Sequence, residues 1–170
     1  YSKDLSTIVG FPIGRRVEYS ILDGTKVIKE GAFKTSNVTG VTLPESIEVI
    51  EKSTFELAKR LRKINIPSKV KEIKESTFDT CSVLKEISFS EGLEKIGYRA
   101  FWQCSNINSL TLPNSLRIID ESGFEGLSGV ENLVLPEGLE EIGDFAFAYN
   151  KYIETITFPS TLRTIGKYAF

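Results

Sequence analysis

The segment LKEISFSEGLEKIGYRAFWQC, residues 84–104, decides the fold of this chain. In its first half, apolar Ile87 and Phe89 alternate with polar Glu86 and Ser88. A period of two is typical of a short strand with one face buried and one face in solvent. The segment therefore begins with a predicted half-buried strand.

The second half of the segment predicts a return path across the core. Leu93 and Ile96 are expected to point inward across a turn. Tyr98–Cys104 is predicted to form one helical turn, with Phe101 and Cys104 facing the core. After that turn the chain is expected to start the next strand, one layer further on.

The same pattern recurs along most of the chain. The closing aromatic residues are Phe33, Phe55, Phe78, Phe101, Phe124, Phe147 and Phe170, so the first interval is 22 residues (33 to 55) and each later one is 23. A second column holds Ile50, Ile73, Ile96, Ile119, Ile142 and Ile165, and a third holds Pro44, Pro67, Ser90, Pro113, Pro136 and Pro159. Self-similarity at such a period indicates a solenoid, in which stacked repeats bury the faces that a lone repeat leaves open.

We therefore predict an α+β repeat solenoid: a right-handed leucine-rich-repeat coil with a parallel, concave β-sheet and short helical turns on the convex side. Six or seven parallel strands are expected, including strands that end at Phe89, Leu112 and Leu135. The repeats of about 23 residues span 17–170, and the last one is incomplete. Residues 1–16 fit no repeat and are expected to form a strand-like N-terminal cap.

Composition limits the functions that the chain can have. Its 170 residues suit one domain or a short array, with 41% hydrophobic and 26% charged residues. A net charge of -2 and a pI near 5.4 argue against a nucleic-acid partner. No apolar run approaches the roughly 18 residues of a membrane span, so no membrane insertion is expected within this segment.

Catalysis and metal binding are not expected. The chain has no His, which removes Ser-His and Cys-His nucleophile pairs and most zinc sites. No column gathers an acid, a base and a nucleophile. We predict no catalytic residue, no cofactor and no metal site, and hence a protein that is not an enzyme.

The columns resemble the BspA-like, or Treponema pallidum-type, leucine-rich repeats. The resemblance covers about residues 17–170 and is carried by the segments LKEISFSEGLEKIGYRAFWQC, INSLTLPNSLRIIDESGFEGL and IETITFPSTLRTIGKYAF. It implies a secreted or surface-displayed protein, of bacteria or of some parasitic protists, that acts in adhesion to host matrix or to other cells. The implied partner is a protein, and the implied location is extracellular or at the cell surface.

A candidate ligand surface follows the solvent side of the predicted strands. Solenoids commonly bind along this side, and its charge changes from basic to acidic along the array. The alternative reading is a solvated sheet face whose small hydroxyl residues suit strands. The candidate ligand-binding residues are Arg62, Lys63, Asn65, Lys85, Glu86, Ser88, Asn108, Ser109, Thr111, Glu131, Asn132, Glu154, Thr155 and Thr157.

The two cysteines and one aromatic pair each have a structural reading and a functional one. Cys81 and Cys104 share one column of adjacent repeats, so a disulfide is sterically open, but parallel side chains favour free buried thiols. Trp102 falls in a column of mostly polar residues and is expected to be exposed. Phe145 and Tyr168 share a column and either cover the loops by stacking or form an aromatic contact patch.

Two functions remain open from the sequence. The first is a surface module that mediates protein-protein interaction or adhesion through the strand face. The second is a structural spacer that presents another domain of a larger surface protein. Because Phe170 stands two-thirds of the way through a repeat, we also expect either that the parent chain continues or that the open end self-associates.

Overall fold

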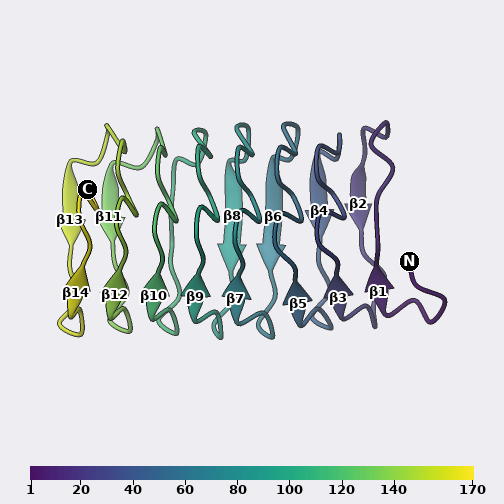
Figure 1. Cartoon of the computed structure of the whole chain (residues 1–170), viewed down its shortest axis with the longest axis horizontal. Helices are drawn as coiled ribbons and strands as arrows, with labels where there is room; N and C mark the ends of the chain where they lie inside the picture. The colour runs from purple at the N-terminus through teal and green to yellow at the C-terminus, as the bar shows by residue number, and fades with distance from the viewer.

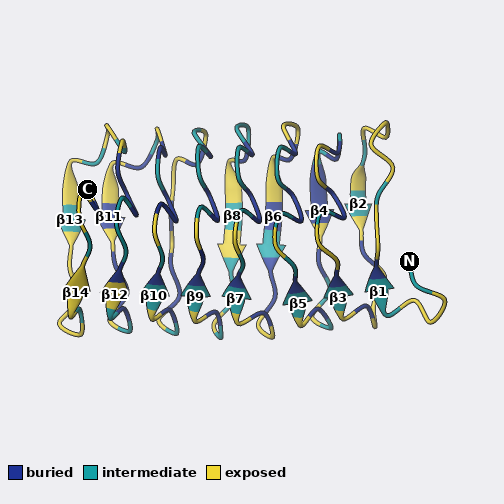
Figure 2. Cartoon of the chain, viewed as in Figure 1, coloured by how far each residue is buried: buried dark blue, intermediate teal, exposed yellow.

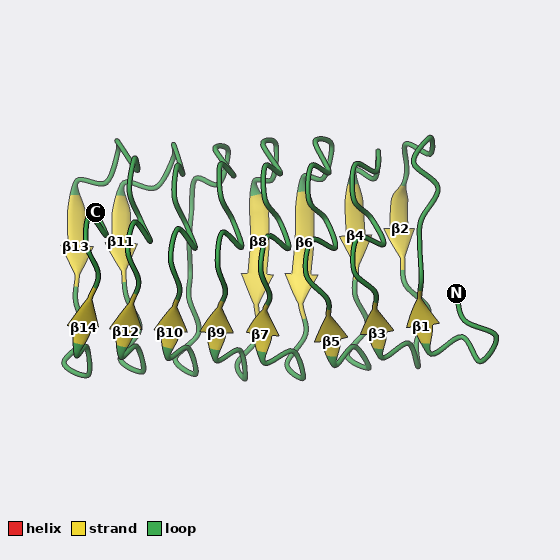
Figure 3. Cartoon of the chain, viewed as in Figure 1, coloured by secondary structure: helices red, strands yellow, loops and turns green.

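The structure is a computed structural model that describes residues 1–170 as a β-solenoid of about seven turns. The coils stack side by side along the long axis, with the two termini at opposite ends (Figure 1). Fourteen short strands and the turns between them make up the whole chain. Figure 3 shows strands and loops only, without any helix.

The first side of the solenoid, called here the long-strand face, carries the strands predicted from the period of two. Neighbouring strands pair in parallel, for example with Ile64 opposite Ile87. Pairing joins β2-β4-β6-β8 and, separately, β11-β13. The strands are β2 (Glu18–Ser20), β4 (Gly40–Thr42), β6 (Lys63–Ile66), β8 (Glu86–Phe89), β11 (Asn132–Val134) and β13 (Thr155–Thr157).

The second side, the short-strand face, is a further parallel sheet made of two-residue strands. The sequence predicted only a turn here, because two residues are too few to display an alternating pattern. Hydrogen bonds join β1-β3-β5 and β7-β9-β10-β12-β14. The strands are β1 (Thr7–Ile8), β3 (Val27–Ile28), β5 (Val49–Ile50), β7 (Glu72–Ile73), β9 (Lys95–Ile96), β10 (Ile118–Ile119), β12 (Glu141–Ile142) and β14 (Thr164–Ile165).

The third side, the turn edge, corrects the predicted fold class. The α+β assignment with helical turns is wrong, because Tyr98–Cys104 is a run of turns. Arg99 and Gln103 have φ of 52° and 56°, which a right-handed helix does not allow. The Arg99 N–H donates to the Glu121 carbonyl O of the next repeat at 3.1 Å, where a helix would use a carbonyl four residues back.

The predicted strand ends are also corrected in part. β8 ends at Phe89 as expected, and β11 ends at Val134, one residue before Leu135. No strand ends at Leu112, because Asn108–Leu112 lies outside every strand. The long-strand face is therefore interrupted by one layer between β8 and β11.

The closing phenylalanines form a continuous stack through the core. Consecutive rings from Phe33 to Phe147 lie 5.0 to 5.5 Å apart, centroid to centroid. All six side chains in this run are at most 1% exposed, and the buried residues run along the inside of the coils (Figure 2). This column holds the layers in register.

The cysteines lie in the same interior. Both are free and buried, as predicted. The Cys81 and Cys104 thiols donate to the carbonyl oxygens of Phe55 and Phe78, each at 3.1 Å. Burial raises the pKa of both thiols, which keeps them protonated.

The two ends of the array differ. At the N-terminal end, the Phe11 ring stacks on Phe33 with centroids 5.0 Å apart. At the C-terminal end, Phe170 stacks on Phe147 at 5.5 Å but is 45% exposed. Phe158 beside it is 47% exposed, so the last layer offers apolar side chains to solvent.

Candidate binding face

The fourteen predicted site residues all lie along the long-strand face, on its strands or directly beside them. Thirteen are exposed, and Asn65 is half-buried. Pairing in register places them in columns, with Lys63 opposite Glu86 and Asn132 opposite Thr155. The alternation seen in the sequence thus positions these side chains on one side of the molecule.

Asn65 has a structural role on this face. Its side-chain nitrogen donates to the Leu43 carbonyl O at 2.9 Å, and its oxygen accepts from the Leu43 N–H at 3.0 Å. The backbone pairing of β4 with β6 ends one residue earlier, at Val41 opposite Ile64. The Asn65 amide therefore replaces a backbone pair between two layers.

The basic residues of the face are only partly free of ion pairs. The Lys63 ammonium lies 3.2 Å from a carboxylate oxygen of Glu18, across the layer of Gly40. A Cβ atom on Gly40 would lie 3.1 Å from the Lys63 Cε atom, so the absence of a side chain opens this path. Arg62 and Lys85 form no ion pair within the protein, and both residues are exposed.

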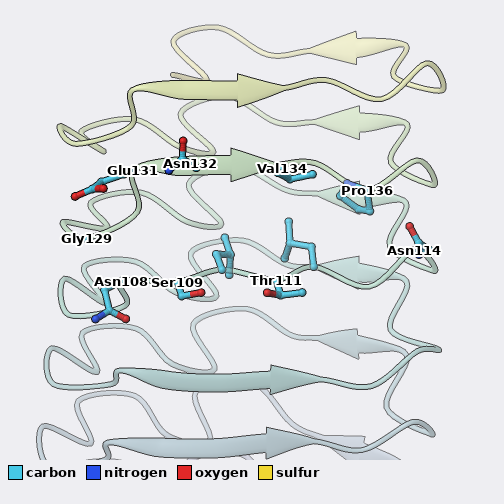
Figure 4. A pocket seen from close by; sticks show the side chains of 11 residues that line it. Asn108, Ser109, Thr111, Asn114, Gly129, Glu131, Asn132, Val134 and Pro136 are labelled. Carbon is cyan, nitrogen blue, oxygen red and sulfur yellow. The ribbon is translucent and has the colours of Figure 1, made fainter.

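Two adjoining hollows mark the middle of the face. One, of about 740 Å³, lies between residues 108–114 and 129–136 (Figure 4). The other, of about 510 Å³, lies over β6 and β8. Asn108, Ser109 and Thr111 line both hollows, so this segment forms their shared wall.

The shared wall coincides with the interruption of the sheet. No backbone hydrogen bond within the protein involves Asn108–Leu112. At one end of the larger hollow the two layers approach each other closely, since a Cβ atom on Gly129 would lie 2.8 Å from the Asn108 Cα atom. The larger hollow is thus lined by the segment without backbone hydrogen bonds and, apart from Glu131, by uncharged residues.

The hollows include eleven of the fourteen predicted residues, counting a third, smaller hollow that contains Arg62. Glu154, Thr155 and Thr157 line none of them. The two larger hollows add residues that were not among the predicted ligand-binding residues. These are Val41, Thr42, Ile64, Ile87, Leu110, Leu112, Asn114, Gly129, Val134 and Pro136.

Three aromatic residues considered from the sequence, Trp102, Phe145 and Tyr168, lie on the turn edge. Trp102 is half-buried, not exposed as its column predicted, and the Arg99 guanidinium carbon lies 4.4 Å from its ring centroid. Phe145 and Tyr168 stack with centroids 5.3 Å apart, and Tyr168 is 73% exposed. Nothing in the chain brings together three His, Cys, Asp or Glu side chains that could hold a metal ion. The fold also has no helix of the length and apolarity needed to span a membrane.

These features define a β-solenoid repeat protein with one open, largely polar strand face. Its sequence matches the BspA type leucine rich repeat region in six copies, over residues 17–128 and 53–170, and the chain belongs to that family. It is therefore a leucine-rich repeat module.

Solved structures share this architecture. The leucine-rich repeat protein of T. pallidum is 25% identical, with a TM-score of 0.80 over 89% of this chain and 73% of that chain. A leucine-rich repeat protein from Bacteroides ovatus is 25% identical, with a TM-score of 0.63 over 95% of this chain and 38% of that one. A leucine rich cell surface protein from Faecalibacterium prausnitzii is 22% identical, with a TM-score of 0.66 over 91% of this chain and 51% of that one, and shows the fold alone. No curated protein matches the chain in sequence.

Proposed function

We propose that this chain is the binding module of a secreted or surface-displayed protein, and that its long-strand face binds a protein partner. The observation that carries the proposal is the pair of adjoining hollows at the interruption of the sheet, with Asn108, Ser109 and Thr111 between them. The turn edge and the short-strand face repeat the same packing from layer to layer. The long-strand face changes in charge and in shape along its length. Such variation is expected of a surface that binds one particular partner.

The charges along this face support a partner with a charged segment. Arg62 and Lys85 stand in neighbouring layers near the middle of the array, and Glu131 and Glu154 occupy the same column in the last two layers. Adjacent parallel strands lie about 4.8 Å apart, so Arg62 and Lys85 can contact one acidic segment together. Such a pattern steers association and fixes the orientation of the partner more than it adds affinity.

The proposed location rests on the family and on one neighbour. The F. prausnitzii structure is that of a cell surface protein, and we extend that location to this chain as part of the proposal. The alternative of a passive spacer predicts no binding by the isolated repeats. The experiment below separates the two.

The test measures binding of the purified chain to a panel of immobilised extracellular-matrix proteins and to intact cells. Arg62→Glu combined with Lys85→Glu should slow association several-fold at low ionic strength. The difference should shrink as salt is added, because the Debye length falls from about 30 Å at 0.01 M to about 3 Å at 1 M. Stability should change by no more than about 0.5 kcal/mol, since both side chains are exposed.

The matched control is Lys29→Glu combined with Lys69→Glu, which changes the net charge equally at exposed positions away from the long-strand face. This control should bind like the wild type. Equal slowing by both variants would reduce the effect to net charge and remove the face from the proposal. A wild-type chain that binds nothing on the panel would favour the spacer.

A further inference from the structure

Exposed cations gather in the first layers of the array, on the path that leads from the turn edge to the long-strand face. In the segment Lys59–Lys63, just before and at the start of β6, four of the five residues are cations and all four are exposed. Two more exposed cations stand in the corresponding segment before β2, two layers earlier (Figure 1). The basic patch, as defined here, consists of Arg15, Arg16, Lys59, Arg60, Arg62 and Lys63.

The basic patch belongs to these layers and not to the repeat pattern. The corresponding segments of the last three layers, residues 102–111, 125–134 and 148–157, contain a single cation, Lys151. The whole chain has a net charge of -2, so the patch opposes the sign of the protein as a whole. Short runs rich in Lys and Arg are typical of surfaces that bind polyanions.

The cations of the patch are mostly free to bind a ligand. Only Lys63 is in an ion pair, with the Glu18 carboxylate at 3.2 Å, and the other five are in none. The Arg60 Nε–H donates to the Asn37 side-chain oxygen of the preceding layer at 3.2 Å. The Asn37 side-chain nitrogen donates in turn to the Ile13 carbonyl O at 3.0 Å. These bonds direct the Arg60 side chain toward the layer in which the first two cations of the patch lie.

A hollow joins the two parts of the patch. It is the third hollow of the long-strand face, of about 430 Å³, and its lining includes Arg16, Arg62 and Lys63. Two carboxylates, those of Glu18 and Glu86, also line it, and the first is engaged by Lys63. The two arginines lie two layers apart, which corresponds to about 10 Å along the array. Because a guanidinium group binds an oxyanion through paired N–H donors, a ligand with anionic groups at regular intervals can contact both.

We propose that the basic patch binds a linear sulfated polysaccharide of the glycosaminoglycan class. The patch offers charge without an apolar anchor, because Leu61, the one apolar residue within Lys59–Lys63, is fully buried. Phe11 and Tyr19, the aromatic residues on either side of the first two cations, pack against the core. Protein partners and single-stranded nucleic acids are held by exposed aromatic or apolar side chains as well as by charge, so a polysaccharide fits this patch better.

The inference goes beyond the proposed function, because it assigns a second ligand to a region that extends past the long-strand face. The probe is immobilised heparin at 0.15 M salt, which the wild-type chain should bind. Lys59→Glu combined with Arg60→Glu should weaken this binding at least about tenfold and should lower the slope of log affinity against log salt by about one for each cation removed, as in other polyanion complexes. The same variant should bind the panel proteins unchanged, since both positions lie outside the long-strand face.

Two further variants and one control sharpen this test. Arg15→Glu combined with Arg16→Glu should weaken heparin binding in the same way from another layer, which guards against a local folding defect. Glu18→Gln removes the carboxylate that engages Lys63 and should tighten heparin binding several-fold. The control is again Lys29→Glu combined with Lys69→Glu, which should bind heparin like the wild type.

Competition identifies the class of ligand. Fully desulfated heparin, polyglutamate and double-stranded DNA, each at equal charge concentration, should compete at least about tenfold less well than heparin, because their anionic groups differ in kind and spacing. Equal competition by any of the three would overturn the assignment to a sulfated polysaccharide.

The outcomes separate this inference from the proposed function. A wild-type chain that does not bind heparin would overturn the inference and leave the proposed protein partner in place. Equal weakening by the control would reduce the effect to net charge and overturn the inference too. Unchanged affinity in Glu18→Gln would contradict the hollow as the centre of the site. A chain that binds heparin through the patch but binds no panel protein would keep the inference and remove the proposed protein partner.

Discussion

The turn edge and the long-strand face belong to the same coils but differ in continuity. On the turn edge, backbone hydrogen bonds link consecutive layers past the point where the strand face is interrupted, as from the Phe101 N–H to the Gly123 carbonyl O at 2.9 Å. On the long-strand face, pairing stops at β8 and resumes at β11. Backbone hydrogen bonding between layers is thus continuous on the turn edge, and it is interrupted on the long-strand face.

The comparison teaches where a repeat protein can vary. A ring in the phenylalanine column contacts the rings above and below it, so a change in one layer disturbs its neighbours. A side chain on the solvent side of a strand has no such constraint, and Gly40, Asn65 and Gly129 each alter the local contacts there. The sites of variation are therefore the sites where function can differ between arrays of one fold.

The largest expected contrast between the two regions is in thiol chemistry. Cys81 and Cys104 should not react with a thiol reagent in the native state, because burial excludes the reagent and raises the pKa of both thiols. A thiol placed in the hollow by Thr111→Cys should react at least about a thousandfold faster, since native thiols must wait for unfolding. Timed labelling with mass spectrometry measures both rates, and in denaturant without reductant the wild-type chain should show two thiols. Fast native labelling of Cys104 would mean that the core opens beside the interrupted layer.

A second contrast is expected in stability. Phe101→Ala removes a ring stacked on both sides and should cost about 3–5 kcal/mol of unfolding free energy. Leu110→Ala, at the interrupted layer, should fall at the lower end of the roughly 2–5 kcal/mol range for such truncations, because a site with a free surface can relax. Urea denaturation measures both values. Equal costs would show that the interrupted layer is packed as tightly as the phenylalanine column.

The parts of this fold that the sequence predicted are those with a repeated side-chain pattern. The phenylalanine, isoleucine and proline columns give the coil length, and the alternation at Glu86–Phe89 gives the strand and its exposed side. The family resemblance is confirmed over the same residues. These features are local and periodic, so they can be found in one sequence.

The wrong or missing parts depend on backbone conformation and on contacts between layers. Tyr98–Cys104 has the spacing of a helical turn, but Arg99 and Gln103 have positive φ and donate their N–H groups to the next repeat. Ser109 and Thr111 have strand-like side chains, and only the three-dimensional arrangement shows that their peptide groups are unpaired. The hollows follow from that arrangement and could not be predicted from columns.

The smallest expected difference in stability is between two asparagines of the long-strand face. Both were predicted from the sequence as ligand-binding residues. Asn65→Ala removes an amide that bonds both peptide groups of Leu43 and should cost about 1–2 kcal/mol of unfolding free energy. Asn132 accepts only one hydrogen bond, from the exposed Thr155 hydroxyl at 2.6 Å, so Asn132→Ala should change stability by no more than about 0.5 kcal/mol.

Binding should show the reverse order, because Asn132 lines the larger hollow whereas the Asn65 amide is engaged by Leu43. Urea denaturation and affinity for a panel protein that binds the wild-type chain, measured on the same two variants, test this reversed order. A small stability loss for Asn65→Ala would mean that water replaces its amide between β4 and β6. Unchanged affinity in Asn132→Ala would mean that the β11 wall of the hollow contributes only its backbone, and the contacts that give specificity would then lie with Ser109 and Thr111.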